Sequence, residues 1–321
     1  MPATQRSPLG GLGYAFAGFA VFATHDAVIK ALGMSYSVFQ IIFFAMLFAF
    51  VPMAMVMLAD RQVDNFRPNH PWLILLRALS SVIAMASAFY AFTVLPLAEV
   101  YALLFATPLL ITALSALLLG EPVRLQRWAA VLVGLVGVIV VLRPGVTEIS
   151  TGHIAALTAA CMSALGSIIM RRIGGQERTA VMILYPMLSS ILFMGAALPF
   201  VYVPMGLSDL GLSASVGLMS VVAQFCLIAA YRAAPAAVVA PTQYSQILWA
   251  TVFGAVFFAE FPDIWVGVGA SIVIGSGVFI VWRESRPKVS ARNPILRNPN
   301  MRYDAGVSPK PKHRRPEAEG E

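Results

Sequence analysis

A run of polar residues interrupts an apolar segment near residue 245, and its side chains are suited to hydrogen bonding a small molecule. The run reads Pro-Thr-Gln-Tyr-Ser-Gln from 241 to 246, and a tryptophan follows at 249. Thr242, Gln246 and Trp249 are spaced i, i+4 and i+7, which places them on one face of a helix with Gln243 beside them. Amides, a hydroxyl and an indole together favour an uncharged or zwitterionic ligand that contains a ring.

Gln224 is expected at a similar depth in the preceding apolar segment, so it joins this candidate binding group. The alternative is that these side chains hydrogen-bond neighbouring helices, which is a common use of Gln and Thr in membranes. Pro241 also releases a backbone carbonyl, which either binds a ligand or only accompanies a kink.

Aromatic residues form a second candidate group. Tyr101 and Phe105 share a helical face, and Tyr90 comes from the segment before them. These rings could stack on a planar ligand, although aromatic residues at helical spacing more often fill a core.

Three ionisable residues inside apolar segments are candidates for ion coupling or gating, because charge at membrane depth is costly. Asp26 and Glu99 are expected in the outer third of their helices and Arg77 in the inner third. The alternatives are an ion pair of Asp26 with Lys30 at i, i+4, and extension of the Arg77 side chain to lipid headgroups, which we favour for that residue.

The amino-acid composition indicates which kind of secondary structure positions these candidate residues. The chain has 321 residues, of which 59% are hydrophobic and 12% charged, with a mean hydropathy of +0.80. These values lie far from the roughly 45–50% apolar and 25% charged residues of soluble domains. The sequence therefore predicts an all-α polytopic membrane protein.

Several other functions are disfavoured. Although the net charge is +7, 10 of the 22 Lys and Arg follow residue 282, so no nucleic-acid partner is expected. The four histidines are scattered, and neither a zinc-protease motif nor a Walker A loop occurs. We predict no enzymatic activity, no catalytic residues, no metal site and no cofactor.

Apolar runs near the length of about 20 residues that a membrane-spanning helix needs occur ten times. The predicted spans are 9–29, 37–58, 72–94, 97–119, 125–142, 152–170, 180–203, 211–231, 236–259 and 264–282. With a cytoplasmic N-terminus, 19 Lys and Arg lie inside and only Lys30 and Arg143 outside, while Arg77 lies within a span. Both termini are therefore predicted to be cytoplasmic.

The second half of the chain repeats the first. Pro96 matches Pro235 and Glu121 matches Glu260, both at a spacing of 139 residues. Repeats of five helices each begin on opposite sides of the membrane, so the halves are predicted to be inverted, as in many secondary transporters. We expect repeats at 9–145 and 150–282, with Pro96 and Pro235 as hinges, followed by a disordered basic tail at 283–321.

These features resemble a known family. The proline hairpins, Leu-Gly-Glu-Pro at 119–122, Trp128 and Arg-Pro-Gly at 143–145 are similar to the EamA-like family of the drug/metabolite transporter superfamily. Asp-Ala-Val-Ile-Lys at 26–30 also resembles bacterial members described as riboflavin or S-adenosylmethionine transporters. The second repeat departs from the pattern, because it has Phe261-Pro262 in place of Pro122 and no acid matching Glu99.

The resemblance implies secondary transport of a small organic metabolite across the bacterial cytoplasmic (inner) membrane. The expected substrate is riboflavin-like, nucleoside-like or amino-acid-like. The alternatives are export of amino acids or amphipathic drugs and, in a different class, a membrane scaffold or sensor. Small-residue stripes at Gly267, Ser271 and Gly275 and at Ala130 and Gly134 predict close packing, either within the bundle or in a homodimer through the fifth and tenth helices.

Overall fold

The computed structural model describes residues 8–59, 67–120, 125–146, 148–174, 176–234 and 236–284. All regular elements in these ranges are helices. They are α1 (Pro8–Gly33), α2 (Val38–Ala59), α3 (Pro71–Val94), α4 (Leu97–Leu104), α5 (Thr107–Leu119), α6 (Leu125–Leu142), α7 (Thr151–Ile173), α8 (Thr179–Val201), α9 (Leu207–Ala233), α10 (Ala236–Val239), the 3₁₀ helix η1 (Ala240–Tyr244), α11 (Ser245–Phe258) and α12 (Ile264–Glu284).

The predicted all-α membrane architecture is confirmed at this level. Eight helical segments are long and apolar enough to cross a membrane, counting α4 and α5 together, and a shorter apolar helix covers Ile264–Ile280. The predicted span at 236–259 consists of three pieces, α10, η1 and α11. The predicted start of the tail at 283 falls in the last turn of α12, and the rest of the tail lies outside the described residues.

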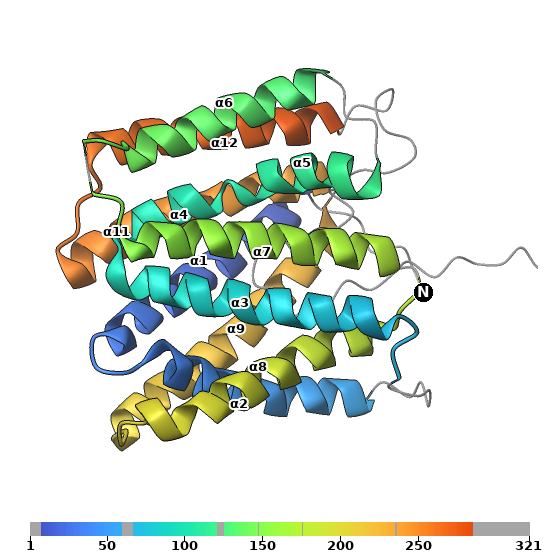
Figure 1. The fold of residues 1–321 in the computed structure, drawn as a ribbon, viewed down its shortest axis with the longest axis vertical. Coiled ribbons are helices and arrows are strands. Elements are labelled where there is room, and N and C mark those ends of the chain that lie inside the picture. Colours follow the sequence, from blue (N-terminus) through green and yellow to red (C-terminus); the bar gives the residue numbers. More distant parts are fainter. Residues whose placement is uncertain are drawn as a thin grey trace, which may run out of the picture.

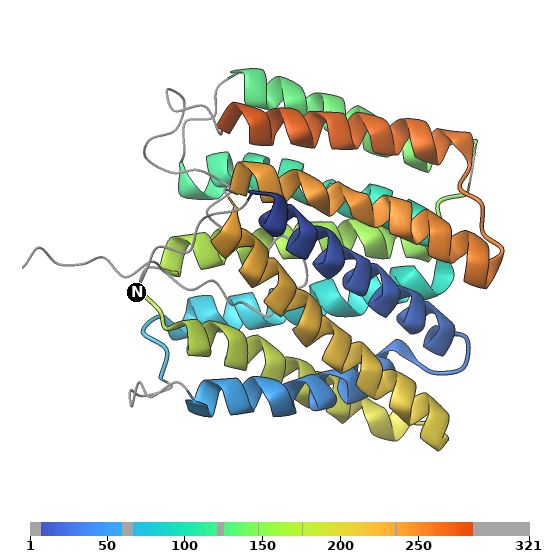
Figure 2. The same ribbon diagram turned by 180° about the vertical axis from the view of Figure 1, so that it is seen from behind.

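The helices form a bundle whose outer layer, α6 with α12, lies at the top of Figure 1. Helices α2 and α8 lie at the opposite edge, and α1, α3, α7 and α9 occupy the middle. Figure 2 shows the same order from behind, with α1 crossing close to α9. We call the end where α1 begins the near side and the opposite end, where α4 begins and α11 ends, the far side.

Contacts between the two halves of the chain are reciprocal. Helix α1 packs against α9, and α7, which would match α1 in the predicted second repeat, packs against α3, which would match α9. In the same way α2 packs against α9 and α8 against α3, while α6 pairs with α12 and α2 with α8. The principal contacts between the two halves therefore occur in equivalent pairs.

The predicted span at 97–119 is confirmed as one candidate membrane span, in which Phe105 and Ala106 form a short turn between α4 and α5. Pro108 lacks the N–H that would bond to the Leu104 carbonyl, and the Thr107 hydroxyl donates to that oxygen instead, at 2.7 Å. The break therefore leaves the carbonyl satisfied.

A similar break lies in the second half, where Pro241 falls inside η1. The Thr242 hydroxyl donates to the Val239 carbonyl at 2.6 Å, which again places a threonine beside a proline. The corresponding helices of both halves are thus interrupted. Pro235, the predicted second hinge, lies outside the described residues.

The α6–α12 pair depends on glycines that allow close backbone approach. A Cβ on Gly269 would lie 2.6 Å from the Gly137 carbonyl oxygen and 2.5 Å from Val141 Cγ2, whereas a Cβ on Gly267 would meet no atom within 4 Å. Gly275 is equally open, while Gly134 faces Leu109 and Ser276. The Ala130–Gly134 stripe therefore packs inside the bundle, and the two glycines of the α12 stripe face open space.

We expect Gly269→Ala to lower the free energy of unfolding by about 1–3 kcal/mol, because backbone atoms on α6 would have to move away. Gly267→Ala, on the same helix, is the matched control and should leave stability unchanged. Thermal unfolding of both purified variants in detergent measures the difference. Equal stability of the two variants would contradict close α6–α12 packing.

Candidate functional site

A cavity of about 80 Å³ lies in the middle of the bundle, with room for several water molecules. Three helices of the first half, α1, α2 and α3, and three of the second, α7, α8 and α9, form its wall. The lining residues are Phe22, His25, Met46, Ala49, Met53, Arg77, Ser81, Ala84, Met85, Phe89, Met162, Ser163, Gly166, Ser167, Ile183, Pro186, Met187, Ser190, Ser220, Val221 and Gln224. The cavity is therefore shared between the two halves.

Arg77 supplies a cation to this wall. Its Nη1 donates to the Gly166 carbonyl and its Nη2 to the Met182 carbonyl, each at 3.3 Å. Both bonds are longer than the usual value of about 2.9–3.0 Å, so an anionic acceptor would bind the guanidinium more strongly. The side chain is covered in this conformation, with 0% exposure, and the cavity must widen before a ligand can reach it.

The expectation that Arg77 extends to lipid headgroups is wrong, because the side chain is fully buried between α3, α7 and α8. Gln224, the other sequence candidate in the wall, is 6% exposed and belongs to α9. The structure thus brings these two predicted residues to one cavity.

The remaining wall combines aromatic rings with thioethers and hydroxyls that sequence reasoning missed. Thioether side chains adapt to ligands of irregular shape, and hydroxyls donate or accept hydrogen bonds. The available signal was the spacing of Arg77, Ser81 and Met85 on α3 and of Ser163 and Ser167 on α7, each a step of four residues on one helical face. The missed methionines and serines are Met46, Met53, Met85, Met162, Met187, Ser81, Ser163, Ser167, Ser190 and Ser220.

Asp26 lies behind the cavity wall in a hydrogen-bonded cluster. His25 Nδ1 is 2.7 Å from Asp26 Oδ1, and the Tyr101 hydroxyl from α4 donates to Asp26 Oδ2. Asp26 is 0% exposed, and His25 forms part of the cavity wall. The alternative pairing of Asp26 with Lys30 is therefore not the one that the structure contains.

Lys30 instead closes the far side. Its Nζ lies 2.8 Å from Glu260 Oε1 and donates to the Leu95 carbonyl at 2.6 Å, and Glu260 Oε2 accepts from the Leu97 N–H at 3.3 Å. The lysine thus connects α1 both to the end of α11 and to the turn at Pro96. Of the matched glutamates, Glu260 is an ion-pair partner, while Glu121 lies outside the described residues.

Glu99 has a different environment from Asp26. Its Oε1 lies 2.8 Å from His153 Nε2, and His153 Nδ1 accepts from the Ser150 N–H at 3.0 Å at the start of α7. Neither Glu99 nor His153 belongs to the cavity wall. This pair ties α4 to the N-terminus of α7 at the far side.

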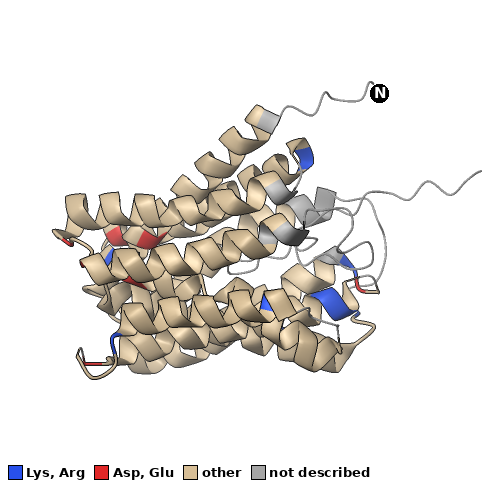
Figure 3. Ribbon diagram, turned by 90° about the horizontal axis from the view of Figure 1, so that it is seen from above, with Lys and Arg blue, Asp and Glu red and all other residues tan. Residues whose placement is uncertain are grey.

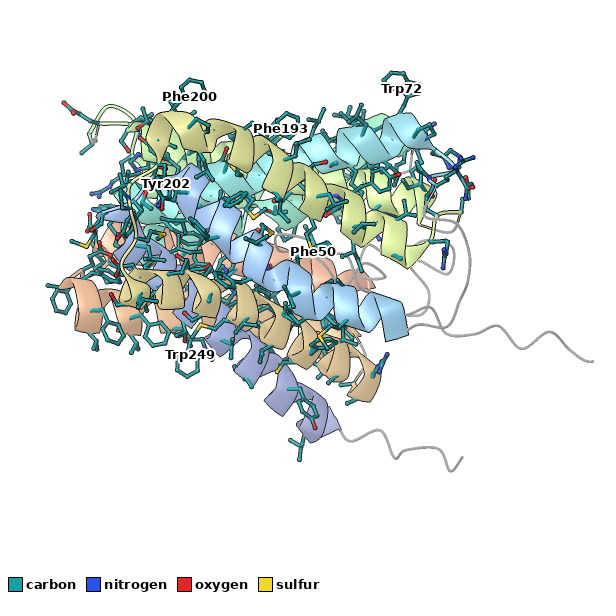
Figure 4. The ribbon with its side chains drawn as sticks, turned by 90° about the horizontal axis from the view of Figure 1, so that it is seen from below. Phe50, Trp72, Phe193, Phe200, Tyr202 and Trp249 are labelled. Atoms are coloured by element: carbon teal, nitrogen blue, oxygen red, sulfur yellow. The ribbon has the colours of Figure 1, made fainter. Side chains whose placement is uncertain are left out.

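The polar run of the predicted ninth span lies outside the cavity wall. It belongs to η1 and α11, which pack against α1 and α4. Thr242 is buried, and Gln243 is partly buried beside it. Trp249 stacks on Phe253 with ring centroids 6.3 Å apart, and its side chain lies at the edge of the bundle in Figure 4.

Three polar atoms at the start of α11 are buried, and the described part of the chain supplies no hydrogen-bond partner for any of them. They are Ser245 Oγ, Gln246 Nε2 and Trp249 Nε1. Since an unsatisfied buried polar group is costly, these three atoms are candidates for hydrogen bonds to water or to a ligand.

The three aromatic candidates lie in different environments. Tyr101 and Phe105 are buried in the core, with Phe105 packed edge-on against Tyr244 at a centroid distance of 5.0 Å. Tyr90 is 37% exposed, and its hydroxyl lies 2.8 Å from the Thr151 hydroxyl beside a separate far-side hollow. Of these rings, only Tyr101 is connected to the cavity wall, through Asp26 and His25.

Comparison with known proteins adds to this picture. Residues 9–143, which cover α1 to α6, match the EamA-like transporter family. An S-adenosylmethionine uptake transporter of Rickettsia felis is 24% identical over 88% of this chain and 95% of its own length. A riboflavin transporter of Rhizobium johnstonii is 28% identical over 68% of this chain and 73% of its own.

A pseudopaline exporter of Pseudomonas aeruginosa is 26% identical over 81% of this chain and 89% of its own. One solved crystal structure, 18% identical, superposes with a TM-score of 0.58 over 87% of this chain and 100% of the other, which shows a shared fold. Residues 9–143 are thus an EamA-family domain of the drug/metabolite transporter superfamily, in a chain that resembles curated membrane transporters over most of its length.

Proposed function

We propose that this protein is a secondary transporter that moves a small organic metabolite across the bacterial cytoplasmic membrane by alternating access. The observation that carries the proposal is the cavity that three helices of each half enclose. Transporters built from inverted repeats bind their substrate between the repeats near the middle of the membrane. The similarity to three kinds of named transporter supports the same function.

The proposed topology has ten spans in two inverted repeats, at 9–145 and 150–282, with both termini in the cytoplasm. The reciprocal contacts of the two halves support it. Figure 3 supports the orientation, because most coloured acidic residues gather at the far side and several of the basic residues lie towards the end that carries the N-terminus. An excess of Lys and Arg is typical of the cytoplasmic face.

Within the cavity, Arg77 and Gln224 are the proposed polar contacts, and the methionines and Phe89 surround the apolar part of the substrate. This combination suits an amino-acid-like molecule with a thioether or ring more closely than a purely apolar drug. The unsatisfied atoms of Ser245, Gln246 and Trp249, with Thr242 and Gln243, provide a second group that substrate meets when α11 moves.

The direct test is flux in proteoliposomes. Purified protein is reconstituted and supplied in turn with labelled S-adenosylmethionine, riboflavin, methionine and adenosine. We expect saturable flux of at least one of these probes and competition by an excess of the same unlabelled compound. Empty liposomes provide the background, and Ser271→Ala, on the outward face of α12, provides a protein control.

Two alternatives give different results in this assay. Export, which the pseudopaline exporter makes a specific alternative, would appear as efflux from loaded vesicles without net uptake in cells. No flux of any metabolite, together with a stable complex with another membrane protein, would identify a scaffold or sensor instead.

We also propose that the open face of α12 at Gly267, Ser271 and Gly275 contacts a second copy of the chain. Crosslinking of Ser271→Cys in membranes would produce a covalent dimer. A monomer only, at every protein density tested, would exclude this interface.

A further inference from the structure

The cluster of His25, Asp26 and Tyr101 connects the cavity to the core between α1 and α4. His25 lies in the cavity wall between two phenylalanines, with ring centroids 6.2 Å from Phe22 and 5.8 Å from Phe89. Asp26 is 0% exposed and Tyr101 1% exposed. A carboxyl group is thus held inside the protein and reaches the cavity through an imidazole.

The hydrogen bonds determine which ring nitrogen can gain a proton. An ionised carboxylate only accepts hydrogen bonds, so His25 Nδ1–H donates to Asp26 Oδ1, while the Tyr101 hydroxyl donates to Oδ2. Nε2 is then the nitrogen that carries the lone pair. Proton binding at Nε2 creates an imidazolium beside the carboxylate, and the net charge of the pair changes from −1 to 0.

We propose that the His25–Asp26 pair binds the proton whose movement drives transport, an inference that rests on the proposed function. A proton enters through the cavity, binds His25 Nε2 and leaves from the same atom when the cavity opens to the other side. Substrate and proton therefore share one cavity. The cluster joins α1 to α4, which begins directly after the Pro96 turn. A change in the charge of the cluster therefore acts directly on α4, the helix that is expected to move.

Glu99, the other carboxylate that the sequence predicts as a coupling residue, has no connection to the cavity wall through its histidine. It also pairs with a histidine, but His153 caps the start of α7 and lies outside the cavity wall. A proton bound to the Glu99–His153 pair would therefore not be exposed first to one side of the membrane and then to the other when the cavity changes its opening. The two carboxylate–histidine pairs thus form a matched comparison within one chain.

Other ionisable groups on the elements around the cluster have roles of their own. The Lys30–Glu260 ion pair lies one turn further along α1, and Arg77 lies in the wall of the same cavity. Two phenols, Tyr231 on α9 and the buried Tyr244 in η1, also lie on elements that pack against α1. Arg77 remains charged at any physiological pH, so the imidazole is the group in the wall whose charge changes in that range.

The test uses proteoliposomes, a clamped membrane voltage and labelled S-adenosylmethionine or riboflavin, whichever the wild type exchanges. A pH difference of about 1 unit should give about tenfold accumulation if one proton accompanies each substrate. Asp26→Asn, behind the cavity wall, should keep exchange at equal pH but lose this accumulation. His25→Gln should also lose the accumulation, whereas Glu99→Gln should keep it. Tyr101→Phe should weaken it.

Accumulation that is unchanged in His25→Gln and Asp26→Asn, or a wild type that exchanges substrate without any response to the pH gradient, would overturn the proposal. A wild type that exchanges neither probe would count against the proposed function for these substrates, and proton binding is then measured without substrate. Nuclear magnetic resonance of ¹⁵N-histidine in the full chain should show that His25 Nε2 gains a proton as the pH is lowered. A ring that does not titrate would refute proton binding at His25.

Discussion

Replacing Arg77 with glutamine is expected to reduce substrate flux by about 100-fold, the largest effect that we predict for any cavity residue. Loss of a buried charged contact to a ligand typically costs about 2–5 kcal/mol, and about 2.8 kcal/mol corresponds to 100-fold. Arg77 is the charged side chain of the cavity wall, and its guanidinium is already held towards α7 and α8 by two carbonyls. Arg77→Lys should retain part of the flux, because it keeps the charge but not the planar fork.

The measurement is initial flux in proteoliposomes, with the amount of folded protein determined by size-exclusion chromatography. Arg172→Gln is the matched control, because Arg172 is an exposed residue in the last turn of α7. Flux through Arg77→Gln that equals the wild-type flux would show that the guanidinium has only a structural role.

Breaking the Lys30–Glu260 ion pair is expected to open the far side. In Glu260→Gln the Lys30 ammonium, 8% exposed as a side chain, keeps the Leu95 carbonyl but loses its counter-ion. Breaking a buried pair typically costs about 3–5 kcal/mol, and because the Glu260 side chain is 24% exposed we expect about 2–3 kcal/mol. The closed conformation should therefore become about 100-fold less favoured relative to the open one.

Labelling of Ala98→Cys, a buried position at the start of α4, measures this opening. Its rate should rise in the Glu260→Gln background and fall again when the charges are exchanged as Lys30→Glu with Glu260→Lys. The matched control is Asp263→Asn, which breaks the more exposed pair with Arg143, an interaction expected to contribute less than about 1 kcal/mol. If Ala98→Cys were labelled at the same rate with and without Glu260→Gln, the Lys30–Glu260 ion pair would not be what holds the far side closed.

The helical segments could be predicted because the hydrocarbon core requires long apolar runs. The break between α4 and α5 could not, since Pro108 is compatible with a continuous kinked helix in a sequence pattern. What ends α4 is the local geometry at Phe105 and Ala106, where Thr107 satisfies the Leu104 carbonyl. Proline position alone does not distinguish these outcomes.

The cavity was predictable only in part. The sequence pattern predicts which polar residues share a helical face, but the helix that this face meets depends on packing between distant segments. Arg77 and Gln224 therefore met at the cavity, whereas Thr242 and Gln246 lie on helices packed against α1 and α4. The serines and methionines of the cavity wall could not be identified from the sequence, because both residue types are common in membrane helices.

The pairing of the ionisable residues illustrates the same limit. Sequence spacing offered Lys30 as the partner of Asp26, four residues away on one helix. The structure pairs Lys30 with Glu260, 230 positions later in the chain, and Asp26 with His25 and Tyr101. Local spacing cannot rank these partners, because the choice depends on how the two halves pack together.

Blocking the cavity at one position tests most directly whether substrate passes through it. Cys161 and Cys226 are free thiols, so both are first replaced by alanine, and Ser81 in the cavity wall is changed to cysteine. Treatment with a membrane-permeant thiol reagent should abolish flux, and saturating substrate should slow the modification. Leu192→Cys, an exposed position on α8 outside the cavity wall, should be modified without loss of flux. Full modification of Ser81→Cys with undiminished flux would contradict a transport path through this cavity.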